Sequence, residues 1–135
     1  MSTAYPRDGG SGVALHHVQV AAPAGCEEEA RRFYGGLLGL SEIEKPPALQ
    51  ERGGVWFALT GGPQLHIGVA DSFVAAVKAH PGFRLAGTVE LQALAVRLAE
   101  AGFAVRWDDE LDGVRRFFVD DPFRNRVEVL AHEGS

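Results

Sequence analysis

The stretch LHHVQV, residues 15–20, alternates apolar and polar side chains near the start of the chain. Successive side chains of a β-strand point to opposite faces, so the wider alternating run 13–22 is predicted to be a strand. His17 and Gln19 share one face of that strand, and Val18 lies on the other. We therefore predict that His17 faces a site that the rest of the chain completes.

The chain has 135 residues, which is enough for one domain with a substantial core. Residues 1–12 lack the basic start and apolar middle of a secretory signal, so we predict a flexible tail and a cytoplasmic protein. No apolar run approaches the roughly 20 residues of a membrane span. The net charge of -5 argues against a nucleic-acid partner and leaves a small-molecule site as the expectation.

Cys26 is the only cysteine, which excludes an internal disulfide and a cysteine-based zinc cluster. Any metal ligands must therefore be His, Asp or Glu. Residues 27–29 are all glutamates at the start of a predicted helix, where negative charge stabilises the helix end. We read that run as helix stabilisation and not as catalysis.

One order of elements occurs twice along the chain, and such a repeat organises the whole fold. In the first half we predict a strand at 13–22, a helix at 26–38 and strands at 40–44, 55–59 and 64–69. In the second half we predict a strand at 80–86, a helix at 88–101 with Thr88 as its N-cap, and strands at 104–107, 115–120 and 126–131. The predicted fold class is α+β, with module one at 13–70, a connector at 71–79 and module two at 80–132.

Four polar residues lie at matching positions of this repeat, on the first and last strands of each half. His17 and His66 are 49 residues apart, and His80 and Glu128 are 48 apart. Strand parity turns all four away from their apolar neighbours. Two halves related by a pseudo-twofold axis would bring them together inside a curved sheet. His16 has the opposite parity and is expected to face the core, and His132 is assigned to the tail.

The chain resembles the vicinal oxygen chelate superfamily, which includes glyoxalase I, extradiol dioxygenases, fosfomycin-resistance thiol transferases and bleomycin-resistance proteins. The resemblance spans about residues 14–131 and is carried by four motifs: LHHV at 15–18, FYGGLLGL at 33–40, FFVDDP at 117–122 and NRVE at 125–128. It implies two βαβββ modules whose curved mixed sheets form a cup around a divalent metal. It also implies a homodimer.

The resemblance places metal ligands at His17, His80 and Glu128, as in the dioxygenases and fosfomycin enzymes. The fourth position, a carboxylate or amide in glyoxalase I relatives, is His66 in this chain. His66 is either a fourth ligand or a base beside the metal, so we assign catalytic roles to His66 and Glu128. A second departure is Arg124, where the superfamily usually has glycine and where a positive φ would be strained.

Three imidazoles and one carboxylate suit Zn²⁺, Ni²⁺, Fe²⁺, Mn²⁺ or Co²⁺, which act as Lewis acids on a substrate oxygen. The parity of the cup also predicts substrate contacts from Gln19, Arg84, Arg116, Phe118 and Arg126. Three arginines facing one cavity favour an anionic substrate. Trp56 and Trp107 either line the cup or pack against helices, and packing is the expectation. The acidic cluster at 108–112 is read as a solvated loop.

These residues leave three functions open. The leading one is a metal-dependent enzyme on a small oxygen-rich molecule, with a lyase, isomerase or thiol-transfer reaction. The first rival is extradiol ring cleavage. The second is a metal-free binding protein of the bleomycin-resistance kind, in which the four polar residues simply face a solvated groove.

Overall fold

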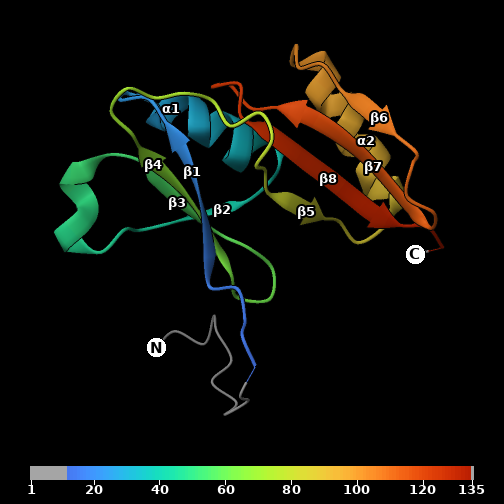
Figure 1. Cartoon of the computed structure of the whole chain (residues 1–135), viewed down its shortest axis with the longest axis horizontal. Coiled ribbons are helices and arrows are strands. Elements are labelled where there is room, and N and C mark those ends of the chain that lie inside the picture. Colours follow the sequence, from blue (N-terminus) through green and yellow to red (C-terminus); the bar gives the residue numbers. More distant parts are fainter. Residues whose placement is uncertain (1–11, 135) are drawn as a thin grey trace. The chain divides into compact units, whose positions relative to one another are not determined.

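The computed structural model describes residues 12–134, in two compact units that meet in the sequence at Phe73 and Val74. Each unit contains one four-stranded mixed sheet with the order strand, helix, three strands (Figure 1). The predicted α+β fold of two βαβββ modules is thereby confirmed. The predicted tail lies outside the described residues except for Gly12. No helix within 12–134 has the length and apolar character needed to cross a membrane.

The first unit is built on a sheet with the strand order β1-β4-β3-β2. β1 is parallel to β4, and the remaining neighbours are antiparallel. Its elements are β1 (His17–Ala22), α1 (Glu27–Ala30), the π-helix η1 (Arg31–Leu37), β2 (Ser41–Ile43), the 3₁₀ helix η2 (Pro47–Arg52), β3 (Val55–Ala58) and β4 (Gln64–Val69). A parallel pair needs a crossover, and the helix after β1 supplies it.

The crossover helix of the first unit widens after its first turn. The backbone N–H of Leu38 donates to the carbonyl of Phe33, five residues earlier, at 2.9 Å. Phe33 and Tyr34 are adjacent in sequence, yet both are fully buried, and they contact each other edge to face. The helix ends at Leu37, and Gly39, two residues later, has φ 83°. Glycine adopts this conformation without steric cost.

The second unit repeats the topology, with the strand order β5-β8-β7-β6 and β5 parallel to β8. Its elements are β5 (Gly82–Arg84), α2 (Thr88–Glu100), β6 (Arg106–Asp108), β7 (Val114–Asp120) and β8 (Arg126–His132). The apolar stripe of α2 is buried, and so is the matching face of β7 and β8, through Leu91, Leu94, Leu98, Phe117, Val119, Val127 and Val129. Each sheet therefore buries one face and leaves polar residues on the other, which we call the open face.

Several local predictions were wrong. The first strand begins at His17, and His16 is exposed, with its Nδ1 atom 3.0 Å from Nδ1 of His17, so it does not face the core. The N-cap of α2 is Gly87, whose backbone is extended, and Thr88 is the first helical residue. His132 belongs to β8 and not to a tail. The ends of strands and helices fray, so local sequence patterns define them poorly.

The turn between β7 and β8 is held by two buried polar side chains. The carboxylate of Asp121 accepts hydrogen bonds from the backbone N–H of Phe123 and Asn125 and from the Asn125 amide. The Asn125 side chain in turn accepts from the backbone N–H of Ala76 in the connector, at 2.9 Å. Arg124 has φ 72° in this turn, so the positive φ expected at this position is present on a non-glycine residue.

Candidate functional site

The open face of the first unit carries both histidines predicted for that unit. Cross-strand register places His17 opposite Gln64, and His66 opposite Gln19 on one side and Trp56 on the other. All five therefore lie on one face of three neighbouring strands. The expectation that Trp56 packs against a helix was wrong.

The three rings on this face form a stack. The His66 ring lies 3.6 Å from the Trp56 ring, with an angle of 2° between their planes. On its other side it lies 4.3 Å from the His17 ring, at 15°. Its Nε2 atom is 2.8 Å from Oε1 of Gln64. His66 is thus both sandwiched between rings and hydrogen-bonded.

The sandwich determines the charge of His66. Only 4% of the residue is exposed. Burial, and then the neighbouring His17 and His16, lower the pKa of His66 from 6.5 to about 4. Removing an imidazolium from water is unfavourable, so the neutral ring is the form present near neutral pH.

Gln19, a predicted substrate contact, lies on the same face and is exposed. Its side-chain amide lies directly over Gly68, where an added Cβ would come within 2.8 Å of Cδ and Oε1 of Gln19. A glycine at this point of β4 lets the amide lie flat against the sheet. Gln19 is therefore positioned by its neighbour strand and presents its amide on the open face.

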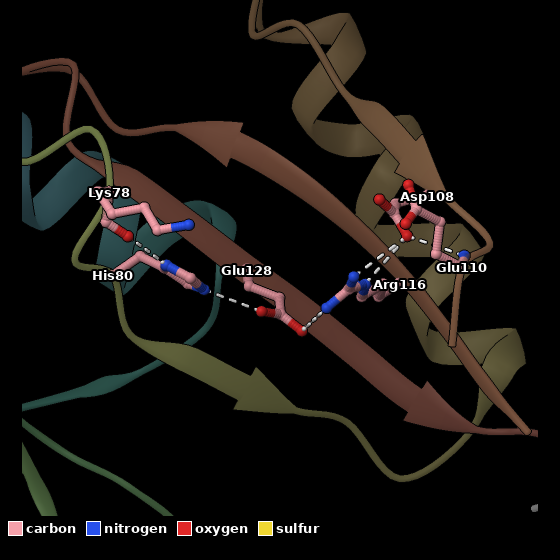
Figure 2. Close-up of polar contacts among 6 residues, drawn as sticks. All are labelled: Lys78, His80, Asp108, Glu110, Arg116 and Glu128. Atoms are coloured by element: carbon pink, nitrogen blue, oxygen red, sulfur yellow. Dashed lines mark hydrogen bonds and ion pairs between the residues drawn. The ribbon is translucent and has the colours of Figure 1, made fainter. Parts of the chain in front are cut away.

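The open face of the second unit carries a row of linked polar side chains centred on Glu128, which is 8% exposed (Figure 2). Oε1 of Glu128 lies 2.9 Å from Nε2 of His80, and Oε2 accepts a hydrogen bond from Nη1 of Arg116 at 3.3 Å. The Arg116 guanidinium also donates from Nε to Oδ1 of Asp108 at 3.2 Å. Four side chains from β6, β7, β8 and the segment before β5 are thus linked.

The side chains at both ends of this row contact backbone atoms. Nδ1 of His80 lies 2.9 Å from the carbonyl oxygen of Lys78. Oδ1 of Asp108 accepts a hydrogen bond from the backbone N–H of Glu110 at 3.0 Å. That hydrogen bond and the Arg116 guanidinium lower the pKa of Asp108. Asp108 is therefore part of the site and not only of a solvated loop.

An aromatic and cationic patch adjoins Glu128. Phe118 lies opposite Glu128 in the β7–β8 register. The guanidinium carbons of Arg116 and Arg126 lie 5.1 Å and 5.4 Å from its ring centroid, which is the range of cation–π contacts. Arg126 makes no ion pair with the described residues of its unit. Arg84, on the neighbouring β5, is exposed.

The four predicted ligands therefore occur as two pairs, His17 with His66 in the first unit and His80 with Glu128 in the second. Within residues 12–134, no group of three or more His, Cys, Asp or Glu side chains is gathered at metal-binding spacing. Sequence reasoning missed the parts played by Asp108 and Trp56. Cross-strand register was the missing signal, since Asp108 lies opposite Arg116 and Trp56 lies opposite His66.

Comparison with known proteins assigns the family. The model of the Glyoxalase/Bleomycin resistance protein/Dioxygenase superfamily matches residues 14–129. The chain belongs to this superfamily. A crystal structure from Bacillus anthracis assigned to the glyoxalase family has 43% sequence identity and a TM-score of 0.83, with 90% of this chain and 96% of that chain covered.

Solved structures of lower sequence identity share the fold. A lactoylglutathione lyase from Agrobacterium tumefaciens has a TM-score of 0.68 at 21% identity, with 87% of this chain and 92% of that chain covered. A glyoxalase/dioxygenase from Nostoc punctiforme has a TM-score of 0.73 at 19% identity, with 88% and 90% covered. At these identities the likeness concerns the fold alone. No curated protein matches the chain.

Proposed function

We propose that this superfamily member is a metal-dependent enzyme that acts on a small, anionic, oxygen-rich molecule by a lyase, isomerase or thiol-transfer reaction. The observation that carries the proposal is the geometry of His80 beside Glu128. Nδ1 of His80 lies at hydrogen-bond distance from a carbonyl oxygen, which can only accept, so the ring hydrogen belongs on Nδ1. In a neutral imidazole the lone pair is then on Nε2.

That lone pair meets the Glu128 carboxylate at 2.9 Å. Two electron-rich atoms at this distance need a cation between them or beside them, either a proton or a metal ion. A histidine that binds a metal usually donates its other ring N–H to a backbone carbonyl or a carboxylate. His80 has that arrangement, so the donor pair fits a divalent ion.

We propose His17 as the third ligand, supplied by the first unit of the same chain or of a partner chain in a homodimer. Nitrogen and carboxylate ligands suit Zn²⁺, Ni²⁺, Fe²⁺, Mn²⁺ or Co²⁺. His66 is the weaker fourth candidate because its Nε2 contacts Gln64 and its ring is sandwiched. A bound ion would supply Lewis-acid stabilisation of negative charge on a substrate oxygen.

Chain residues would bind and orient the substrate. Arg126 has no carboxylate partner in its unit, so its guanidinium is available for a carboxylate or phosphonate. Arg84, Phe118 and Gln19 are the other proposed substrate contacts, whereas the guanidinium of Arg116 is already engaged by Glu128 and Asp108. Glu128 is the proposed proton acceptor. His66 is neutral near pH 7, but its pKa of about 4 makes it a weak base, so its catalytic role would be secondary.

The metal content of untagged protein, purified without chelators, tests the proposal. We expect close to one ion per chain, and thermal stabilisation when Ni²⁺, Zn²⁺, Mn²⁺ or Fe²⁺ is added. His17→Ala and His80→Ala should each lose the ion. His132→Ala is the matched control, since it removes an exposed histidine at the end of β8. Wild-type protein without an ion and without stabilisation would contradict a metal-dependent enzyme.

A metal-free binding protein is the second candidate, favoured by the ring stack of the first unit. Trp56, His66 and His17 offer flat surfaces suited to an aromatic ligand. Ligand-induced protection from thermal unfolding in metal-free buffer would support this candidate. Oxygen consumption with a catechol would instead indicate ring cleavage. Light scattering of the purified protein tests the proposed dimer.

A further inference from the structure

Arg116 connects two carboxylates across the open face of the second unit. Its Nη1 donates to Oε2 of Glu128 at 3.3 Å, and its Nε and Nη2 lie 3.2 Å from Oδ1 of Asp108 (Figure 2). The side chain is largely covered, with 19% of it exposed. A substrate-binding arginine needs free guanidinium N–H groups, whereas the guanidinium of Arg116 already donates to two carboxylates.

We propose that Arg116 and Asp108 are positioning residues that set how Glu128 binds a divalent cation. This inference rests on the proposed function of the site. Arg116 holds Oε2 of Glu128, which leaves Oε1 directed at Nε2 of His80. The terminal torsion of a glutamate is broad, so an unheld carboxylate would sample other orientations. Holding one oxygen presents the other as a single ligand atom.

Asp108 has a distinct part in this arrangement. A guanidinium next to a ligand carboxylate opposes the binding of a second cation. The Asp108 carboxylate, on the far side of Arg116, offsets that positive charge and is itself fixed by the Glu110 N–H. Loss of Asp108 would leave Arg116 with Glu128 as its single acidic partner. The cation site would then compete with the full charge of the arginine.

The experiment measures the affinity of untagged full-length protein for Co²⁺ or Ni²⁺ in competition with a chromophoric chelator. The variants are Arg116→Met, Asp108→Asn and the double variant. Arg115→Met is the matched control, because Arg115 is on the opposite face of β7 with its guanidinium 4.4 Å from the Trp107 ring. Asp120→Asn is the second control, since Asp120 pairs with Arg106 and not with Arg116.

We expect Arg116→Met and Asp108→Asn each to weaken metal binding by about 10- to 100-fold, the range for partners of metal ligands. In Arg116→Met the lost orientation of Glu128 outweighs the relieved repulsion, because Asp108 already offsets that charge in the wild type. Both controls should stay within about twofold of wild type. Because Asp108 acts through Arg116, the double variant should be no weaker than Arg116→Met alone.

Three results would overturn the inference: unchanged affinity in Asp108→Asn or Arg116→Met, an equal loss in Arg115→Met, or additive losses in the double variant. Asp108→Asn preserves side-chain size and decides the question if Arg116→Met does not fold. Wild-type protein that binds neither ion is a different result, because it refutes the proposed function itself. The thermal unfolding of each variant without metal separates a positioning effect from a loss of fold.

Discussion

His66 in the first unit and Glu128 in the second occupy the same register position of the same topology. Each lies on the strand that comes last in the sequence of its unit, β4 or β8. Each is opposite an aromatic residue of the preceding strand: Trp56 for His66 and Phe118 for Glu128. In the first unit the neighbours are rings, and the titratable group is neutral. In the second unit the neighbours are a histidine and an arginine, and the group is a carboxylate that contacts both.

The comparison shows that topology determines where a side chain points, whereas its immediate neighbours determine its charge. His66 meets two flat rings and the amide of Gln64. Glu128 meets the guanidinium of Arg116 on one oxygen and Nε2 of His80 on the other. The pseudo-equivalent halves therefore offer different chemistry, one aromatic and neutral, the other ionic.

Exchanging the two groups should have the largest effect. In His66→Glu, a carboxylate would lie between Trp56 and His17, with no lysine or arginine on the strands of its own sheet. An uncompensated buried charge costs about 3–5 kcal/mol, so we expect a loss of that order in the free energy of unfolding at pH 7 in chelator. His66→Gln is the control and should lose much less. Urea denaturation measures both, and a loss in His66→Glu no larger than that in His66→Gln would contradict the ring-sandwich account.

Acid should destabilise the first unit specifically. The folded protein keeps His66 neutral down to a pKa of about 4, whereas the unfolded chain takes up the proton below about 6.5. The contribution to stability is full above pH 6.5 and falls as the pH decreases towards 4, by about 3 kcal/mol in total.

The measurement is urea denaturation at several pH values between 7 and 4 in metal-free buffer. His66→Gln cannot take up this proton, so its stability should fall less over the same range. Parallel curves for wild type and His66→Gln would show that His66 has an ordinary pKa.

Removing the Trp56 ring should have an intermediate effect. Trp56→Ala deletes one side of the sandwich, and we expect a loss of about 2 kcal/mol in stability for this half-buried ring. Water would then reach His66, so its pKa should rise towards 6.5, as followed by NMR of the imidazole. Phe118→Ala is the matched variant in the second unit and should leave the pKa of His66 unchanged. A pKa of His66 that stays near 4 in Trp56→Ala would contradict burial by Trp56 as its cause.

The smallest effect concerns the turn before the last strand of each sheet. In the first unit this turn contains Gly61 and Gly62, at φ 89° and 114°, whereas the second unit has Arg124 at φ 72°. Arg124→Gly relieves left-handed strain of about 1–2 kcal/mol, partly offset by the greater freedom of glycine in the unfolded chain. We expect a gain of up to about 1 kcal/mol, measured by thermal unfolding. Arg124→Ala keeps the strain and should not gain.

Much of the architecture could be predicted because its signals are local. The alternation of residues 15–20 and the apolar stripe of α2 predicted which faces are buried. The repeat of element order predicted two modules of one topology. The pairs His17 with His66 and His80 with Glu128 lie on the open faces expected from parity. Element ends and single caps, such as Thr88, were displaced by a residue or more, and His16 does not face the core.

The neighbours of each polar group could not be predicted in the same way. Asp108 was read as part of a solvated loop, because runs of acidic residues usually are. It lies instead on β6, opposite Arg116 of the neighbouring strand β7. Trp56 was expected against a helix because large aromatic residues usually pack there. Both assignments depend on cross-strand register, which a single strand does not contain.

The sequence by itself determined the doubled βαβββ order and the side of each sheet on which His17 and its three counterparts lie. Hydrophobic periodicity is a property of neighbouring residues, and it needs no knowledge of distant ones. Only the tertiary structure decided that His66 is enclosed by rings and that Glu128 is held by Arg116 and His80. Those contacts join residues far apart in the chain, and burial and charge act through space.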